Sequence, residues 1–234
     1  MTNLLEVQNI HTFIGQFHIL EGVSVEVPKG SITVLLGRNG AGKTTTLKSI
    51  IGLTPPNQGS ILFDGTPIQG RRSFDIAAMG IGFVPENRAI FRDLSVAENL
   101  RIAERRKGDL ARKEEFIFGL FPDLKRLIKL PGTNLSGGQQ QMLAVARALV
   151  PDNKLLLIDE PSEGLAPVLI EQMIDAIQKL ATETTVLLVE QNFIVASKLA
   201  ERYVIIEEGQ SVKQGLMADL VDDKETIHRY LGAA

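Results

Sequence analysis

A glycine-rich stretch, GRNGAGKTT at residues 37–45, constrains this chain more than any other part of its sequence. It follows the apolar run Ile32–Leu36 and opens a helical pattern, which is the setting that the G-x-x-x-x-G-K-[ST] spacing requires. Backbone N–H groups of such a loop surround phosphate oxygens, and the N-terminus of the following helix adds a favourable dipole. The stretch therefore predicts a phosphate-binding loop rather than a glycine-rich turn with a surface lysine.

Two side chains of this loop have a predicted chemical role. Lys43 is expected to neutralise the β- and γ-phosphates of a nucleotide, and the Thr44 hydroxyl is expected to bind Mg²⁺. The residues of the loop that we predict to bind the nucleotide are Gly37, Asn39, Gly40, Ala41, Gly42, Lys43, Thr44 and Thr45.

Short runs of β-forming residues recur along the chain, and helical patterns separate the later ones. Continuous apolar runs are typical of strands that are buried on both faces. The predicted strands are Leu4–Val7, Val23–Val27, Ile32–Leu36, Ile61–Phe63, Ile81–Val84, Leu155–Ile158, Val186–Val189 and Tyr203–Glu207. A helix over 166–180 is predicted from apolar residues at Val168, Leu169, Met173, Ile174 and Ile177. Strands that alternate with helices predict an α/β fold with a mostly parallel sheet.

Residues 91–150 differ from the rest of the chain because they contain no convincing strand. They have the pattern of successive helices, including an exposed charged helix, RIAERRKGDLARKEE, that is broken at Gly108. We expect a single domain over residues 1–234, with a nucleotide-binding core formed by 1–90 and 151–234 and an inserted helical subdomain at 91–150. The stretch EEGQSVKQG near the C-terminus predicts a hairpin followed by a short helix.

Charge and composition argue against several classes of protein. The formal net charge of -3 lacks the basic footprint of nucleic-acid binding, so nucleic acid is not an expected partner. No run approaches the roughly 20 apolar residues that a membrane-spanning helix needs, and MTNLLEVQNI lacks the pattern of a signal peptide. The chain has no cysteine, which excludes disulfides, thiolate zinc sites and a cysteine nucleophile and favours a reducing compartment.

Two carboxylates, Asp159 and Glu160, follow the apolar run Leu155–Ile158 in KLLLIDEP. An acid pair beside a buried strand is costly unless a cation or a catalytic role accounts for it. Asp159 is expected to reach Mg²⁺, directly or through water, and Glu160 to act as the general base on the attacking water. The alternative is an acid pair that simply faces solvent at the end of a strand. The phosphate loop argues against this alternative, because a nucleotide-binding site accounts for both motifs.

A second glycine pair occurs in LSGGQQQ at 135–141, at the predicted start of a helix. Ser136 and Gln139 have the spacing of a capping box, and the helix continues with apolar Met142, Leu143, Ala146 and Leu149. Gly137 and Gly138 are poor helix formers, at up to about 1 kcal/mol each relative to Ala. The stretch therefore fits either a well-capped helix or a backbone site that an anion approaches closely, and the residues alone favour neither.

The stretches GRNGAGKT, LSGGQ and LLLIDEPS, in this order and with these separations, resemble the ATP-binding subunit of ABC transporters over essentially the whole chain. LSGGQ is specific to that family among phosphate-loop proteins. The resemblance implies a RecA-like P-loop NTPase core with an N-terminal antiparallel β part and an inserted helical subdomain. It also implies ATP and Mg²⁺ as cofactors and a head-to-tail dimer. In that dimer, LSGGQ of one chain contacts the γ-phosphate of ATP held by the phosphate loop of the other, through Ser136, Gly137, Gly138 and Gln139.

The resemblance extends to further site residues, some of which depart from the usual pattern. Gln191 stands where most members have a switch histidine, and glutamine donates to phosphate oxygens without becoming cationic near neutral pH. Glu86 stands where a glutamine usually senses Mg²⁺ and the transmembrane partner, and Ala166 stands at the usual D-loop aspartate. The implied catalytic residues are Glu160, Lys43 and Gln191, and the implied Mg²⁺ ligands are Thr44, Asp159 and Glu86, with Glu86 also near the nucleotide.

The adenine-stacking aromatic that usually precedes Gly15 is replaced by Ile14. Phe13 is the predicted substitute that contacts the nucleotide, while Phe17, or neither phenylalanine, remains an alternative.

The combination VPE-x-R, GLAP and LLVEQN resembles the second ATPase of branched-chain amino acid importers, and LLGRNGAGKTT and PSEG have some likeness to urea importer ATPases. Both imply a second ATPase subunit, identical or not, two membrane permeases and a periplasmic solute-binding protein. The segment 83–100 would receive a permease's cytoplasmic coupling helix. The expected location is the cytoplasmic face of the bacterial inner membrane, as a peripheral protein.

Other functions account for fewer of these features. A small-molecule kinase shares the phosphate loop but does not explain LSGGQ, and a GTPase lacks an N-K-x-D stretch, because Asn153 and Lys154 are followed by two leucines. A non-transport ABC ATPase that acts on DNA or ribosomes remains an alternative, although the acidic net charge counts against it.

Overall fold

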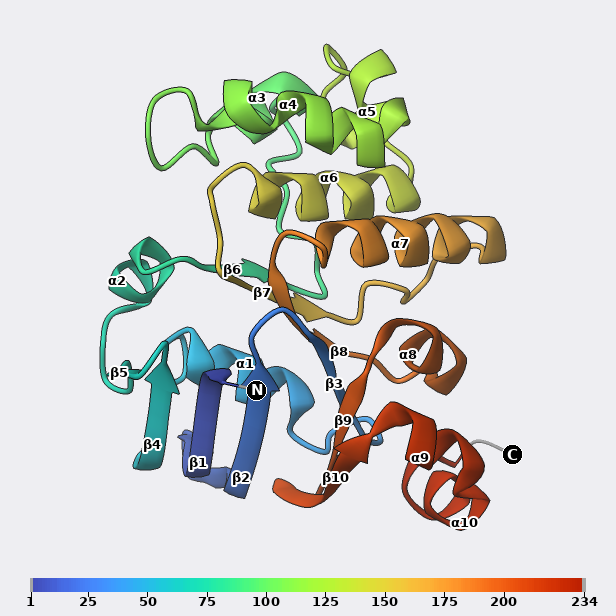
Figure 1. The fold of residues 1–234 in the computed structure, drawn as a ribbon. Coiled ribbons are helices and arrows are strands. Elements are labelled where there is room, and N and C mark those ends of the chain that lie inside the picture. Colours follow the sequence, from blue (N-terminus) through green and yellow to red (C-terminus); the bar gives the residue numbers. More distant parts are fainter. Residues whose placement is uncertain (1, 233–234) are drawn as a thin grey trace.

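The continuous apolar runs form the central strands of a six-stranded sheet in the computed structural model, which describes residues 2–232 (Figure 1). Its order is β10 (Gln210–Leu216), β9 (Arg202–Glu207), β3 (Ile32–Leu36), β8 (Thr185–Val189), β7 (Leu155–Asp159) and β6 (Ile81–Val84). All neighbours are parallel except the β9–β10 hairpin. The predicted α/β fold with a mostly parallel sheet is therefore confirmed.

Both faces of the central strands β3, β8 and β7 are covered, which is why these strands are apolar at nearly every position, whereas the edge strand β10 is mostly exposed. In β7, Leu156 and Ile158 belong to one hydrophobic core, whereas Leu155 and Leu157 belong to the other. The first core includes residues of the helices α3–α7, and the second includes residues of α1 and of the N-terminal sheet. The sheet thus separates the molecule into two layers, with charged groups displaced to the ends of its strands.

A second, antiparallel sheet is formed by the N-terminal part of the chain, in the order β2 (Phe17–Pro28), β1 (Asn3–Ile14), β4 (Gln58–Phe63) and β5 (Thr66–Pro67). The predicted N-terminal antiparallel part is thereby confirmed. Its strands are longer than the apolar runs that predicted them, because their outer parts carry polar residues that remain exposed. The sequence pattern did not indicate β5, because this strand has only two residues.

Helices cover the sheets, and those between β6 and β7 lie together in Figure 1. None of the helices in the described residues is long and apolar enough to cross a membrane. Their bounds are α1 (Lys43–Ile50), α2 (Ser73–Ala78), α3 (Val96–Arg101), α4 (Asp109–Leu120), α5 (Pro122–Arg126), η1 (Gly132–Asn134), α6 (Gly137–Leu149), α7 (Pro167–Leu180), α8 (Phe193–Leu199), α9 (Met217–Asp222), α10 (Lys224–Thr226) and η2 (Ile227–Leu231).

Two helix predictions need correction. The charged helix expected around 101–115 does not begin before Gly108, since α3 ends at Arg101 and turns follow; Gly108, with a φ of 91°, precedes the first residue of α4. On α7, Met173, Ile174 and Ile177 are buried as expected. Val168 was expected on the same apolar face but is 70% exposed, because the 3.6-residue turn of the helix places it on the face opposite Ile177.

The turn between β9 and β10 joins the N-terminal antiparallel sheet to the phosphate loop. The Gly209 N–H donates to the Ala41 carbonyl at 3.0 Å, and the Gly209 carbonyl accepts from the Glu21 N–H at 2.7 Å. Gly209 has a φ of 76°, and a Cβ at this position would lie 2.3 Å from the Ile19 carbonyl oxygen. Only glycine therefore lets this turn contact β2 and the phosphate loop together.

We predict that Gly209→Ala destabilises the protein far more than Gly65→Ala. Gly65 has a similar φ of 72°, but a Cβ at that position would have no atom within 4 Å, so it serves as the matched control for backbone strain alone. Gly65→Ala should lower the free energy of unfolding by about 1–2 kcal/mol. Gly209→Ala should cost about 3 kcal/mol or more, because a backbone oxygen must also shift. Equal losses in urea denaturation would contradict the packing described for this turn.

Candidate active site

The carboxyl ends of four neighbouring parallel strands bring the predicted motifs to one edge of the sheet. The phosphate loop follows β3, Glu86 follows β6, the acid pair lies at the end of β7, and Gln191 follows β8. This edge is where α/β sheets bind ligands. It contains an open cleft of about 420 Å³ lined by Ile14, Ile19, Asn39, Gly40, Gly42, Lys43, Thr44, Thr45, Glu86, Glu160 and Glu163.

Lys43 is held inside the phosphate loop by three oxygen atoms. Its side chain is only 4% exposed, and its Nζ donates to the carbonyls of Gly37 at 2.9 Å and Arg38 at 3.2 Å. The same Nζ lies 3.5 Å from Oε1 of Glu160. The ammonium group is therefore fixed at the cleft, next to the carboxylate predicted to act as the base.

Asp159 is buried and its carboxylate is only partly satisfied. The Thr44 hydroxyl donates to Oδ1 at 3.1 Å, whereas Oδ2 is buried and has no hydrogen-bond partner within residues 2–232. Burial raises the pKa of Asp159 to about 6, with the nearby charges of Glu160 and Glu86 acting in the same direction and the Thr44 hydrogen bond opposing them. An unsatisfied carboxylate oxygen beside a threonine hydroxyl fits Mg²⁺, which prefers oxygen ligands.

Glu160 combines a strained backbone with a position at the junction of two cavities. Its φ of 45° is unusual for a residue with a side chain, and its N–H donates to the Val189 carbonyl at 2.9 Å. Glu160 and Glu163 line both the cleft and a second cavity of about 360 Å³. The remaining lining residues of that second cavity are Ser162, Glu190, Gln191 and Asn192. The structure thus brings Gln191 to the same cavity as Glu160.

The LSGGQ stretch forms the capped start of α6. The predicted capping box is confirmed, since the Gln139 N–H donates to Ser136 Oγ at 3.3 Å and the Ser136 N–H donates to Gln139 Oε1 at 2.9 Å. Gly138 is buried, and a Cβ there would lie 2.3 Å from Leu169 Cδ1 of α7. The close neighbour that requires this glycine is therefore a side chain of the same protein. Ser136 and Gly137, in contrast, are exposed.

The LSGGQ stretch is separate from the phosphate loop of the same chain. Residues of α6 pack in the core on one face of the six-stranded sheet, and residues of α1 pack in the core on the other face. Figure 1 shows these helices well apart, and residues 136–139 are absent from the lining of the cleft. A charged neighbour of the stretch is Arg88, whose Nη1 would lie 3.2 Å from a Cβ on Gly137 and whose Nε donates to Gln141 Oε1 at 3.3 Å.

The β1–β2 hairpin presents different side chains to its two sides. The ring of Phe13 stacks on His18, with centroids 4.2 Å apart, and does not line the cleft in the described residues. Ile14 does line it and pairs with Phe17 across the strands, so Phe17 faces the same side as Ile14. Phe17 is 64% exposed beside the cleft, and Phe13 is on the opposite side.

Glu190 was not singled out by the sequence analysis, although it is only 1% exposed and lines the cavity beside Glu160. It directly follows the continuous apolar run of β8, as Asp159 completes that of β7. The same reasoning that identified the acid pair after Leu155–Ile158 could therefore have found it.

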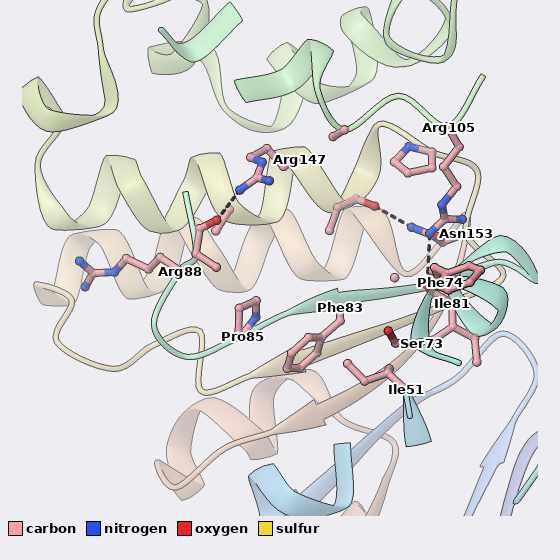
Figure 2. A pocket seen from close by; sticks show the side chains of 17 residues that line it. Ile51, Ser73, Phe74, Ile81, Phe83, Pro85, Arg88, Arg105, Arg147 and Asn153 are labelled. Carbon is pink, nitrogen blue, oxygen red and sulfur yellow. Dashed lines mark hydrogen bonds between the residues drawn. The ribbon is translucent and has the colours of Figure 1, made fainter. Parts of the chain in front are cut away.

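A groove of about 400 Å³ lies apart from the cleft, between α6 on one side and α2 and β6 on the other (Figure 2). Its wall includes Phe83 and the exposed ring of Phe74, together with three arginines, Arg88, Arg105 and Arg147. Arg147 donates to the Ala89 carbonyl at 2.5 Å, and its Nε is buried without a hydrogen-bond partner in the part of the chain described. Burial lowers the pKa of Arg105 and of Arg147. The groove therefore combines apolar surface with cationic groups.

Comparison with known proteins identifies the family. The sequence family described as ABC transporter matches residues 20–163, which is more than half of the chain. The chain belongs to the ABC transporter ATP-binding family. In this family the ATP-binding subunits bind and hydrolyse ATP to drive transport, and they work as dimers with transmembrane permease subunits.

Individual relatives match this ABC ATPase over nearly its whole length. It is 41% identical to the high-affinity branched-chain amino acid transport ATP-binding protein BraG of Pseudomonas aeruginosa, covering 98% of this chain and 100% of the relative. It is 33% identical to the "Probable branched-chain amino acid transport ATP-binding protein LivF" of Archaeoglobus fulgidus, covering 95% and 96%. A crystal structure of a nucleotide-free ATP-binding cassette from an ABC transporter superposes with a TM-score of 0.86 over all of both chains, at 23% identity, which shows the shared fold.

We predict that Asp159 makes the protein less stable as the pH rises from about 4 to about 6. Its pKa is higher in the folded protein than in the unfolded chain, so the folded state holds the proton more tightly. Its ionisation should therefore lower the free energy of unfolding by up to about 3 kcal/mol across that range, with no further change above it. Urea denaturation without Mg²⁺ at pH 4.5 and 7, compared between wild type and Asp159→Asn, measures this contribution. An unchanged pH dependence in Asp159→Asn would rule it out.

Proposed function

We propose that this chain is the ATP-hydrolysing subunit of an importer of branched-chain amino acids. The contact of Lys43 with Glu160, beside the Thr44–Asp159 pair, carries the assignment of ATP chemistry. The branched-chain cargo is supported by BraG and LivF, which match almost the entire chain and whose names specify this transport.

The residues of the cleft account for the hydrolysis of ATP. Lys43 neutralises the β- and γ-phosphates, and the backbone N–H groups of the loop surround them. Thr44 and Asp159, with Glu86 nearby, would hold Mg²⁺, which neutralises charge on the phosphates when it is bound. Glu160 accepts the proton of the attacking water, and Gln191, which lines the same cavity, donates a hydrogen bond to the γ-phosphate.

A second copy, or a related subunit, completes this site through its LSGGQ stretch. Ser136 and Gly137 are exposed on the opposite side of the sheet from α1, which supports contact with a nucleotide on another chain. The free N–H groups at the start of α6 suit a γ-phosphate, and Gln139 keeps Ser136 in its capping position. A lysine is not needed there because the partner's Lys43 already binds the same phosphates.

The adenine base would lie on the side of the β1–β2 hairpin that faces the cleft. Ile14 and Ile19 line the cleft, and the exposed Phe17 shares their side of the hairpin. We therefore assign base stacking to Phe17 in place of Phe13, whose ring is stacked on His18.

The groove in Figure 2 is the proposed docking site for a membrane permease. It includes Phe83, Pro85, Arg88 and Ala89 from the segment 83–100, which was expected to receive the permease's coupling helix. It also lies between residues 91–150, the proposed helical subdomain, and the nucleotide-binding core of 1–90 and 151–234. The complete assembly would contain two ATPase subunits, two permeases and a periplasmic solute-binding protein, with this chain at the cytoplasmic face of the bacterial inner membrane.

Glu160→Gln should leave ATP binding intact, nearly abolish ATP turnover and accumulate ATP-bound dimers. Glutamine cannot accept the proton of the attacking water, whereas Lys43 and the loop that binds ATP are unchanged. We expect kcat to fall by a factor of about 10² to 10⁴, measured by phosphate release, with dimers detected by light scattering in ATP. Rapid turnover in this variant would refute the role of Glu160.

The control for the dimer adds Ser136→Arg to Glu160→Gln. The larger side chain should block the contact between two chains without touching the phosphate loop, so ATP should still bind to monomers. If monomers lost ATP affinity, the LSGGQ stretch would act on the nucleotide of its own chain.

The complex of this chain with its permeases and solute-binding protein should take up leucine in proteoliposomes when ATP and Mg²⁺ are supplied. Urea uptake in place of leucine uptake would contradict the cargo.

Phe74→Asp should reduce both permease binding and uptake, because it places a charge on the apolar wall of the groove, while the ATPase activity of the isolated chain stays unchanged. Normal uptake by this variant would exclude the groove as the docking site.

A further inference from the structure

Glu190 is a buried carboxylate that bridges two loops of the active site. Its Oε1 accepts from the Ser162 N–H at 3.2 Å, and its Oε2 accepts from the Asn192 N–H at 3.2 Å. Ser162 follows Glu160 on the loop after β7, while Asn192 follows Gln191 on the loop after β8. One carboxylate therefore connects the loop of the proposed base to the loop of the proposed γ-phosphate donor.

This bridge lies where the sheet stops holding the two strands together. The last paired residues of β7 and β8 are Asp159 and Val189, and the Glu160 N–H adds one more bond to the Val189 carbonyl. Beyond that point the ladder ends, and the bond from the Ser162 N–H to Glu190 joins the diverging loops. The bond from the Asn192 N–H fixes Glu190 within its own loop, next to Gln191. The spacing of Glu160 from Gln191 therefore depends on Glu190 as well as on the sheet.

A buried acid of this kind is costly unless its contacts offset the loss of hydration. Burial raises the pKa of Glu190, and hydrogen bonds from Ser162 and Asn192 lower it. No lysine, arginine or histidine forms an ion pair with it in the part of the chain that the structure describes. Hydrogen bonds from Ser162 and Asn192, and not a cationic side chain, hold this carboxylate, so its contacts serve the arrangement of the two loops.

We propose that Glu190 is a positioning residue for ATP hydrolysis, which holds the Glu160 loop and the Gln191 loop in the arrangement that the reaction requires. This inference rests on the proposed ATPase function. Within the described residues, Glu190 forms no hydrogen bond or ion pair with Lys43 or the phosphate loop, and it does not line the cleft, so its role concerns the rate of the chemical step and not the binding of ATP.

The chemistry of the side chain predicts a graded response to substitution. In Glu190→Gln, the amide oxygen can accept from one N–H, but the amide NH₂ cannot accept from the other, so one of the two bonds is lost. Glu190→Ala removes both. Because small displacements of catalytic groups are costly, we expect kcat to fall about tenfold in the first variant and about 100-fold in the second, with KM for ATP within about twofold of wild type.

The experiment measures kcat and KM for ATP in the full-length chain, together with amide hydrogen exchange at Ser162 and Asn192. Glu201→Gln, which neutralises an exposed carboxylate elsewhere on the surface, is the matched control and should leave both constants and both amides unchanged. Faster exchange at one amide in Glu190→Gln and at both in Glu190→Ala, with a lower kcat and a constant KM, is the expected result. If Glu190→Ala does not fold, kcat, KM and amide hydrogen exchange in Glu190→Gln test the positioning role.

Three results would overturn this inference. They are an unchanged kcat in the folded variants, a parallel loss of kcat and ATP affinity that indicates general damage, and protected amides at both Ser162 and Asn192. Failure of the proposed function would be distinguishable, since it requires a wild-type chain without ATPase activity or rapid turnover by Glu160→Gln. With wild type active and Glu160→Gln inactive, the Glu190 variants test only the positioning role.

Discussion

Burial of both faces of the six-stranded sheet determines where this protein can place its charges. Apolar side chains occupy both sides of β3, β7 and β8, so ionisable groups collect where these parallel strands end. Lys43, Asp159, Glu160 and Glu190 are all at this edge, and each is largely removed from water. The low exposure strengthens every interaction among them and makes each unsatisfied atom costly, as the free Oδ2 of Asp159 illustrates within the described residues.

The same sheet explains why one chain carries two separate regions for a single nucleotide. The phosphate loop opens a helix packed on one face, and LSGGQ opens a helix packed on the other. Neither helix start can reach the other within the monomer. The proposed dimer follows from this separation. The ATP-binding subunits of this family work as dimers, and in a dimer the LSGGQ stretch of one chain can contact the nucleotide of the other.

Most of the framework could be predicted from the sequence, because local patterns determine it. The bounds of β3 and β6 match their apolar runs, and the capping box at Ser136 follows from the side-chain types alone. What the sequence left open depends on contacts between distant residues. The packing of Leu169 against Gly138 requires the placement of α7 on α6. The side of the hairpin on which Phe17 lies depends on the register between β1 and β2, because a shift of one residue would move each side chain to the opposite side. The roles of the individual site residues remain predictions.

The turn at Gly209 has a consequence for how the protein can respond to its ligand. Its backbone bonds connect β2, which belongs to the hairpin beside the cleft, to Ala41 of the phosphate loop. The base and the phosphates of a bound nucleotide would thus contact two segments, β2 and the phosphate loop, that these backbone hydrogen bonds hold together. Movement driven by the ligand would then not separate β2 from the phosphate loop. It would occur between this connected region and the helices that follow β6.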